Sequence, residues 1–200
     1  MQAETTKSDY EIVGSPLIHK TFLIGTLFLF WYILSGRTEM KFLIYGALTA
    51  VVTTMVTYPL LLVPNQSRTK CYFIFGVSPV KALSYFFWLM YQLIMANIDV
   101  LLATTDQELA IDPKVLKFRF TADNPVASVI LANSITLTPG TVTMDVTNDG
   151  IYTIHALTPG AAEGIISGDF PAHVAHLCGE ENDFLLMDDG SDSGLKEAKA

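Results

Sequence analysis

The sequence predicts an α-helical membrane region followed by a small cytoplasmic α/β domain that contains a β-hairpin. Charged residues make up only 16% of the chain, against about 25% in a typical soluble domain. The 22 residues from Phe42 to Val63 carry no charge, and a helix of that length can cross a hydrocarbon core of about 30 Å. Beyond residue 113 the chain instead alternates apolar and polar residues between turn signals, as short strands do.

Residues 1–16 form a polar arm, which we expect on the cytoplasmic side, and residues 17–34 form the first predicted transmembrane helix. Gly14-Ser15-Pro16 is a helix-start signal, because proline suits the first helical turn. Lys20 can snorkel to the headgroups at one end, and Trp31 and Tyr32 suit the interface at the other. No small-residue cleavage pattern follows this apolar run, so we expect a retained helix rather than a signal peptide.

The second transmembrane helix is predicted at about residues 41–63, ending between Pro59 and Pro64. Small and hydroxyl residues recur along it, and in lipid such residues let helices approach closely. These residues could pack against the first helix or against helices of other subunits. They are Gly46, Ala47, Thr49, Ala50, Thr53, Thr54 and Thr57.

A third apolar helix is predicted at about residues 82–103, either spanning or interfacial. Its 17 uncharged residues from Ala82 to Ile98 run straight into Asp99. At 3.6 residues per turn, one face of this helix is more polar than the other, and Asn97 falls on the less polar face. A polar residue at membrane depth is a functional hypothesis by default, but for Asn97 and Asp99 we expect an interfacial, helix-capping position rather than an ion path. The polar face holds Ser84, Trp88, Tyr91, Gln92 and Asp99.

Positive charges favour two spanning helices. With two spans, five basic residues (Lys7, Lys20, Arg68, Lys70, Lys81) lie on one side, against Arg37 and Lys41 on the other. With three spans, Lys114, Lys117 and Arg119 join the smaller group and the count becomes five against five. The positive-inside rule thus favours a multi-pass protein of the inner (cytoplasmic) membrane with both termini cytoplasmic. The third helix would then lie along or dip into the inner interface.

The cytoplasmic α/β domain is predicted at residues 104–177. A polar hinge at 104–113 leads into a strand at 115–120, and Asp123-Asn124-Pro125 caps a helix at 126–135. Thr138-Pro139-Gly140 predicts a type II turn, which requires a positive φ at Gly140. Strands at 141–146 and 151–157 form a hairpin through an Asn-Asp-Gly turn, and a broken helix follows at 161–177.

The last segment, residues 178–200, is predicted to be an acidic, disordered tail. Its acidic residues contribute much of the net charge of −8. This balance argues against nucleic acid as a partner, because nucleic-acid binding needs clustered Lys and Arg.

No catalytic, cofactor or metal site can be assembled from the sequence, and we expect the chain not to be an enzyme. Cys71 and Cys178 are far apart and follow no metal spacing, so free thiols are expected. His173 and His176 are three residues apart but lack a third ligand. His155 is expected to be a packed or edge histidine. The threonines around Gly140 lack the Gly-x-x-x-x-Gly-Lys spacing of a phosphate loop.

The segment LANSITLTPGT (131–141), followed by a strand, an Asn-Asp-Gly turn and IHAL (154–157), resembles the E component of the Mrp (also called Mnh) multi-subunit cation/proton antiporters. The resemblance covers roughly residues 24–157 in layout and 131–157 in the specific motif. Ala96-Asn97-Ile98-Asp99-Val100 also looks like a family feature, whereas residues 158–200 match no known pattern. The residues of the motif, interpreted as structural, are Asn133, Ser134, Thr136, Thr138, Pro139, Gly140, Thr141 and His155.

This resemblance implies an accessory or assembly subunit of a Na⁺/H⁺ antiporter complex in the cell membrane. In that family the ion paths are attributed to the large antiporter-like subunits, so the implied partners are other membrane subunits and the lipid bilayer. Membrane-bound hydrogenases and sulfane reductases carry a homologous subunit, so such a redox-driven ion pump is an alternative. A third hypothesis is a stand-alone, membrane-anchored binding module.

Overall fold

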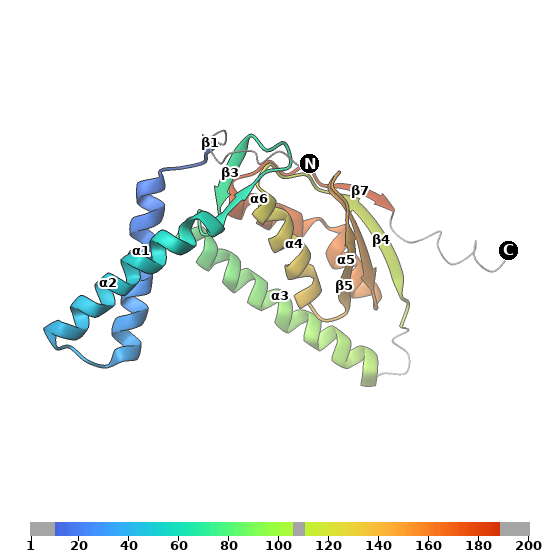
Figure 1. Ribbon diagram of the computed structural model, residues 1–200. Helices are drawn as coiled ribbons and strands as arrows, with labels where there is room; N and C mark the ends of the chain where they lie inside the picture. The colour runs from blue at the N-terminus through green and yellow to red at the C-terminus, as the bar shows by residue number, and fades with distance from the viewer. Residues whose placement is uncertain (1–10, 106–110, 189–200) are drawn as a thin grey trace, which may run out of the picture. The chain divides into compact units, whose positions relative to one another are not determined.

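The computed structural model describes residues 11–105 and 111–188. The chain divides into two compact units, residues 1–76 and 77–200. Three described segments are long and apolar enough to cross a membrane: Pro16–Ser35, Met40–Leu61 and Pro79–Thr105. Since the chain also contains a small α/β domain, the predicted fold class is confirmed (Figure 1).

The first unit is a helical hairpin whose open end is closed by a small sheet. Helix α1 (Pro16–Ser35) ends at Gly36, whose φ of 59° suits the left-handed conformation, and α2 (Met40–Thr57) packs back against it. Strand β1 (Glu11–Ile12) precedes α1 and pairs in parallel with β3 (Lys70–Phe73), which follows α2. The start of α1 and the chain that leaves α2 are therefore held on the same side.

Helix α2 is shorter than expected. It ends at Thr57 rather than near residue 63, and the chain continues as a 3₁₀ turn, η1 (Tyr58–Leu61), and β2 (Leu62–Pro64). Pro59 accounts for the change, because proline lacks the amide hydrogen of the helical ladder and clashes with the preceding turn. Strand β2 then pairs antiparallel with β3.

The second unit is a four-stranded antiparallel sheet with helices against one face. Its strands, β4 (Lys114–Arg119), β5 (Thr141–Val146), β6 (Ile151–Ala156) and β7 (Leu185–Asp188), follow the order β5-β6-β4-β7. The helices are α3 (Pro79–Thr105), α4 (Pro125–Leu137), α5 (Pro159–Ile166) and α6 (Asp169–Cys178). The broken helix expected after the hairpin is thus α5 and α6, separated at Gly168, where φ is 73°.

Alternation on β4 and β6 places one set of side chains in the core. Leu116 and Phe118 of β4 and Tyr152 and Ile154 of β6 have no exposed surface, and the rings of Phe118 and Tyr152 stack at 4.9 Å. Leu131 and Ile135 of α4 and Val174 of α6 complete this core. The segment after the hairpin therefore supplies core residues and belongs to the domain.

Strand β5 has an unexpected burial pattern. Its threonine Thr141 is buried, while Val142 and Met144 are 50% and 60% exposed. The Thr141 hydroxyl donates to the Ile135 carbonyl at 2.5 Å, so its polar atom is satisfied inside. Val142 pairs with His155 of β6, whose neighbours Ile154 and Ala156 are buried, so both lie on the face of the sheet turned away from the core.

The expectation of a disordered tail from residue 178 is wrong for the segment up to 188. Leu185–Asp188 forms β7, which pairs with β4, and Leu186 packs against the core. Two acidic side chains also hold this segment to the loop before α4. Asp183 accepts from the amide of Thr121 at 2.9 Å, and Glu180 accepts from the amide of Asn124 at 3.1 Å. The remainder of the predicted tail, 189–200, lies outside the described residues.

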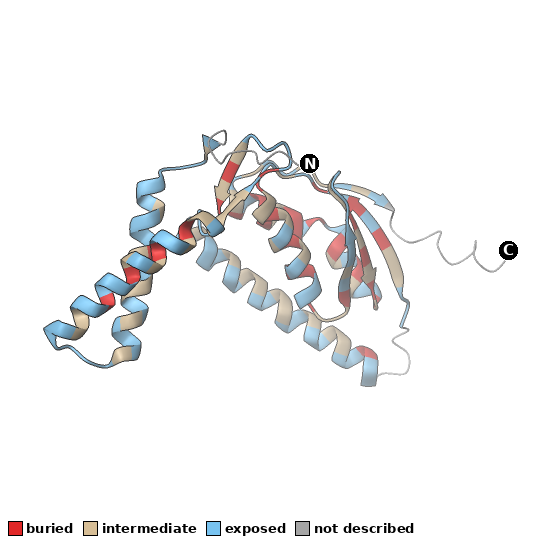
Figure 2. Cartoon of the chain, viewed as in Figure 1, coloured by how far each residue is buried: buried red, intermediate tan, exposed pale blue. Residues whose placement is uncertain are grey.

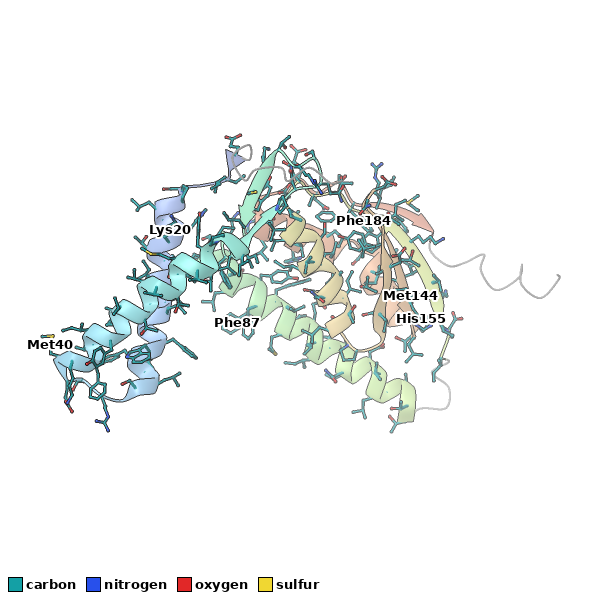
Figure 3. The ribbon with its side chains drawn as sticks, viewed as in Figure 1. Lys20, Met40, Phe87, Met144, His155 and Phe184 are labelled. Atoms are coloured by element: carbon teal, nitrogen blue, oxygen red, sulfur yellow. The ribbon has the colours of Figure 1, made fainter. Side chains whose placement is uncertain are left out.

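Helix α3 is longer than the expected 82–103 and has two unlike faces. Trp88 packs against the core cluster and stacks on His173 with ring centroids 3.9 Å apart. On the other side Phe87 and Leu101 are 63% and 61% exposed (Figures 2 and 3). The helix therefore covers the α/β domain with one face and presents large apolar side chains with the other.

Candidate functional site

The Thr138-Pro139-Gly140 turn lies where α4, β5, α3 and α5 come together. Gly140 has a φ of 86°, as the type II turn requires, and the Thr141 amide donates to the Thr138 carbonyl at 3.3 Å to close the turn. A Cβ at Gly140 would lie 3.3 Å from Val100 Cγ2 and 3.4 Å from Ala161 Cβ. The glycine therefore provides both the backbone conformation and the room for two neighbouring helices.

Hydroxyl groups in the motif satisfy the carbonyls at the end of α4. Thr138 donates to the Ser134 carbonyl at 2.9 Å, and Thr143 donates to the Ala132 carbonyl at 3.0 Å. The last four carbonyls of a helix have no partner within the helix, and in α4 the hydroxyls of Thr138 and Thr141 reach two of these, those of Ser134 and Ile135. The bond to Ala132 lies one turn further in. Threonine at these positions thus fastens the end of α4 to the first strand of the hairpin.

Ser134 connects the motif to α3. The hydroxyls of Ser134 and Tyr85 lie 2.7 Å apart, and Ser134 is buried. Thr136 bonds along the same edge, accepting from the Thr143 amide at 3.1 Å. Asn133 is exposed, and no hydrogen bond of its side chain to this network is found among the described residues.

Asp99 binds the first turn of α5. Its Oδ2 accepts from the Thr158 hydroxyl at 2.6 Å, and the Thr158 Oγ1 accepts from the Ala161 amide at 3.1 Å as the N-cap of α5. A Cβ at Gly160 would lie 2.9 Å from Asp99 Oδ1. A carboxylate at a helix N-terminus is favoured by the free amides and the helix dipole.

A cavity of about 220 Å³ opens beside this contact. Residues from α3, the turn, α5 and α6 line it, among them Gln92 and Asp99 of α3, Pro139 of the turn, Gly164 of α5 and Phe170 of α6. Its walls are mostly apolar, and the Asp99 carboxylate contributes a negative group to them. Within the described residues, no group of three or more His, Cys, Asp or Glu is placed to hold a metal ion.

The structure separates the two polar residues expected at the interface. Asp99 binds the domain, whereas the Asn97 side chain bonds within its own helix, donating to the Leu93 carbonyl at 2.7 Å. Neither residue ends α3, which continues to Thr105, so the expected capping of this helix is wrong. Asp99 instead accepts a hydrogen bond from Thr158, the residue that caps α5.

The other sequence candidates lie away from the turn. His155 is half-buried in β6, an inner strand, opposite Val115 and Val142, so it is not an edge residue. His173 stacks on Trp88. Both cysteines are free, as expected, and burial raises the pKa of the Cys178 thiol to about 11.

Three residues of the site escaped the sequence reasoning: Tyr85, Thr158 and Gly160. Thr158-Pro159 is a helix-start signal that the pattern could have revealed, since threonine caps and proline follows at the first position. Tyr85 carries no such signal, because its partner Ser134 lies far along the chain.

Comparisons with known proteins agree with this architecture. A family model described as a Na⁺/H⁺ ion antiporter subunit (MNHE) matches residues 24–175. Among solved structures, a chain of an archaeal respiratory membrane complex, the membrane-bound sulfane sulfur reductase, is similar, with 30% identity and a TM-score of 0.52. The similarity covers 68% of the present chain and 81% of that chain. Curated proteins gave no match.

The match to the family model includes α2, α3 and the motif turn, and it reaches into α6. The interpretation that residues 158–200 match no known pattern is therefore wrong for residues 158–175. The chain therefore belongs to the MNHE family of Na⁺/H⁺ ion antiporter subunits.

Proposed function

We propose that this chain is an accessory subunit of a Na⁺/H⁺ antiporter complex, required for assembly and not itself the ion path. The observation that carries the proposal is the lack of charged side chains in the interiors of α1 and α2, beyond Lys20 and Lys41 near their first turns. No Asp, Glu, Lys or Arg occurs between Thr21 and Ser35 or between Phe42 and Val63. Ion and proton paths through membranes use such groups.

The contacts of Asp99 support the same proposal. Asp99 is the acidic residue of α3 and the group in this helix that could take part in ion movement. Its carboxylate is instead bonded to Thr158 at the start of α5. A residue used in this way holds α3 to the domain. The motif turn, whose hydroxyls bond to the carbonyls of α4, then acts as a structural junction.

We further propose that both ends of the helical hairpin face the cytoplasm and that α3 lies in the inner interface. The pairing of β1 with β3 supports a common side for the two ends of the hairpin. For α3, one face packs on the domain while Phe86, Phe87, Met90 and Ile94 are exposed on the other. An apolar face of this kind fits the boundary between headgroups and acyl chains.

The test of an accessory role separates assembly from transport. Asp99→Asn retains an acceptor for the Thr158 hydroxyl and removes the negative charge. We expect an amount of intact complex close to normal and an unchanged transport rate per complex. A fully assembled complex that has lost transport would show that Asp99 takes part in ion movement and would overturn the proposal.

Cysteine labelling tests the orientation, with Cys71 and Cys178 replaced by serine. A cysteine at Glu39, in the loop of the hairpin, should react with an impermeant maleimide from outside. One at Asp149, in the turn between β5 and β6, should react only after permeabilisation. Labelling at Lys7 from outside would support three spanning helices instead.

A redox-driven complex is the second candidate, because the similar solved chain belongs to a sulfane sulfur reductase. A tagged version of the chain, isolated with its partners, distinguishes the two complexes. Reduction of sulfane sulfur by the isolated complex would favour the redox assembly. The absence of this activity, together with Na⁺-dependent proton movement in vesicles, would favour the antiporter. Recovery of the chain alone after mild solubilisation would instead support the stand-alone module.

A further inference from the structure

A wedge-shaped hollow lies between α1 and α2, near the loop that joins them. Its volume is about 500 Å³, within the range of about 300–1,000 Å³ typical of ligand pockets. Its lining is mainly apolar and includes Leu27, Phe30, Trp31 and Leu34 of α1 and Phe42 of α2. The hollow belongs entirely to the helical hairpin, and the proposed function assigns it no role.

The wedge arises from the way the two helices touch. The buried residues of α2 are Gly46, Ala50 and Thr54, one on each successive turn, so the contact is a narrow stripe of small residues. The indole of Trp31 lies directly on Gly46, since a Cβ there would be 2.3 Å from Trp31 Cδ1. This ring holds the helices apart on the side where the hollow opens.

The Trp31 indole lines the wedge and carries a hydrogen-bond donor without a partner in the described part of the chain. Its Nε1 is buried and has no hydrogen-bond partner among the described residues. An indole N–H in an apolar place normally finds an acceptor. This N–H lies against Gly46, where an added Cβ would be 2.6 Å from Nε1, so the donor is enclosed in the contact between the helices.

A positive charge lies at the mouth of the wedge. Arg37, in the connecting loop, lines the hollow, and its guanidinium carbon is 4.9 Å from the centre of the Phe42 ring. No ion pair of Arg37 is found among the described residues, whereas Lys41 is paired with Glu39 at 2.8 Å. The mouth therefore carries one uncompensated cation.

We propose that this wedge binds one anionic phospholipid, with an acyl chain along the apolar lining and the phosphate at Arg37. The guanidinium offers a planar fork of donors that matches phosphate oxygens. In the orientation proposed above, the loop that carries Arg37 faces outside, so the lipid would come from the outer leaflet. A helix of another subunit would suit the apolar lining but would leave Arg37 without a counter-charge, so the charge selects the lipid.

Tryptophan quenching in nanodiscs tests the proposal on the full-length chain. The chain has two tryptophans, so Trp88→Phe leaves Trp31 as the single reporter. The probes are brominated phosphatidylglycerol and brominated phosphatidylcholine, compared at equal mole fractions. One cation near a membrane surface is worth about 1 kcal/mol for an anionic lipid, so we expect quenching to indicate about fivefold preferential binding of the anionic lipid.

Two variants with the same change of charge sharpen the test, both in the Trp88→Phe background. Arg37→Gln should remove the preference. Lys20→Gln, which removes a charge near the other end of α1, should retain it. The emission spectrum of Trp31 in lipid without bromine should be the same in all three proteins, which verifies that the hairpin is intact.

Three results would overturn the proposal. Equal quenching by the two lipids in the Trp88→Phe protein would show that the wedge does not select charge. A preference that survives Arg37→Gln would show that Arg37 does not provide the selection. Absence of quenching by either lipid would show that the wedge is closed to lipid, by a second copy or another protein segment. None of these results depends on whether the assembled complex is an antiporter.

Discussion

The two units of this chain contain similar apolar residues but use them differently. In the α/β unit, Leu116, Phe118, Leu131 and Ile154 have no exposed surface. In the helical hairpin, only 6% of the most apolar 18-residue stretch of Pro16–Ser35 is buried, and only 22% of the corresponding stretch of Met40–Leu61. The α/β unit removes apolar surface from water, whereas the hairpin leaves its surface to lipid and to other subunits.

This difference changes what stabilises each unit. The hydrophobic effect contributes about 25 cal/mol per Å² of apolar surface removed from water, so it acts on the α/β core. Between helices in a bilayer that force is missing, and close packing of small residues replaces it. Truncation of a large side chain should therefore have unequal consequences in the two units.

The largest expected effect is that of Phe118→Ala. This residue is fully buried and stacked on Tyr152, so its loss should cost about 3–5 kcal/mol. Folded domains have a free energy of unfolding of only about 5–15 kcal/mol, so a large part of it would be lost. Amide hydrogen exchange of β6 in the detergent-solubilised chain measures the change.

The matched control is Phe30→Ala in α1, where the ring is 63% exposed. We expect β6 exchange in this variant to be the same as in the unsubstituted chain. Slow exchange of β6 in Phe118→Ala, or fast exchange in Phe30→Ala, would contradict the division into a core-stabilised unit and a lipid-stabilised unit.

Gly140→Val should have the next largest effect. A β-branched residue at φ 86° is strained by about 1–2 kcal/mol, and its side chain would also press on Val100 and Ala161. We expect a reduced yield of intact complex, and a milder reduction for Gly140→Ala. The amount of complex and the transport rate per complex are measured separately. Normal assembly with a lost rate in Gly140→Val would mean that the turn acts in transport directly.

The Cys178 thiol should give the α/β unit a stability that depends on alkaline pH. Burial raises its pKa to about 11, from an ordinary value of 9.0. Because the folded state holds this proton more tightly, the contribution is complete below about pH 9 and is lost as the pH rises toward about 11. Denaturant midpoints at about pH 8 and about pH 10.5 should differ in the native chain, and the difference should be smaller in Cys178→Ala.

His155→Ala should have the smallest effect. The ring lies half-buried on the face of the sheet away from the core, beside Val142 and Val115. We expect assembly and transport close to normal. A lost transport rate in this variant would assign a direct function to the outer face of the sheet. We expect this face to be a surface without a role in transport.

The local signals of the sequence predicted much of the α/β unit. Asn124 caps α4, accepting from the Val126 amide at 3.0 Å, and the β5–β6 hairpin turns at Gly150 with φ 75°. These features depend on residues close together in the chain, so pattern and turn chemistry suffice. The positive φ of Gly140 was predicted for the same reason.

Features that join distant segments could not be predicted in this way. The bond between Asp99 and Thr158 connects residues 59 positions apart, and β7 forms only because β4 offers it a free edge. The acidic residues around 180 suggested disorder because their partners, the free amides before α4, are backbone groups that no side-chain pattern reveals. The role of the motif residues in the complex stays a prediction.

The parallel pairing of β1 with β3 has a consequence for biogenesis. Glu11 leaves the ribosome long before its partner Lys70, and both helices of the hairpin lie between them. If only one helix were inserted, β1 and β3 would lie on opposite sides of the bilayer and could not pair. In the proposed orientation the small sheet can therefore form only after both helices have inserted, and it would protect correctly inserted chains while leaving the others open to membrane proteases.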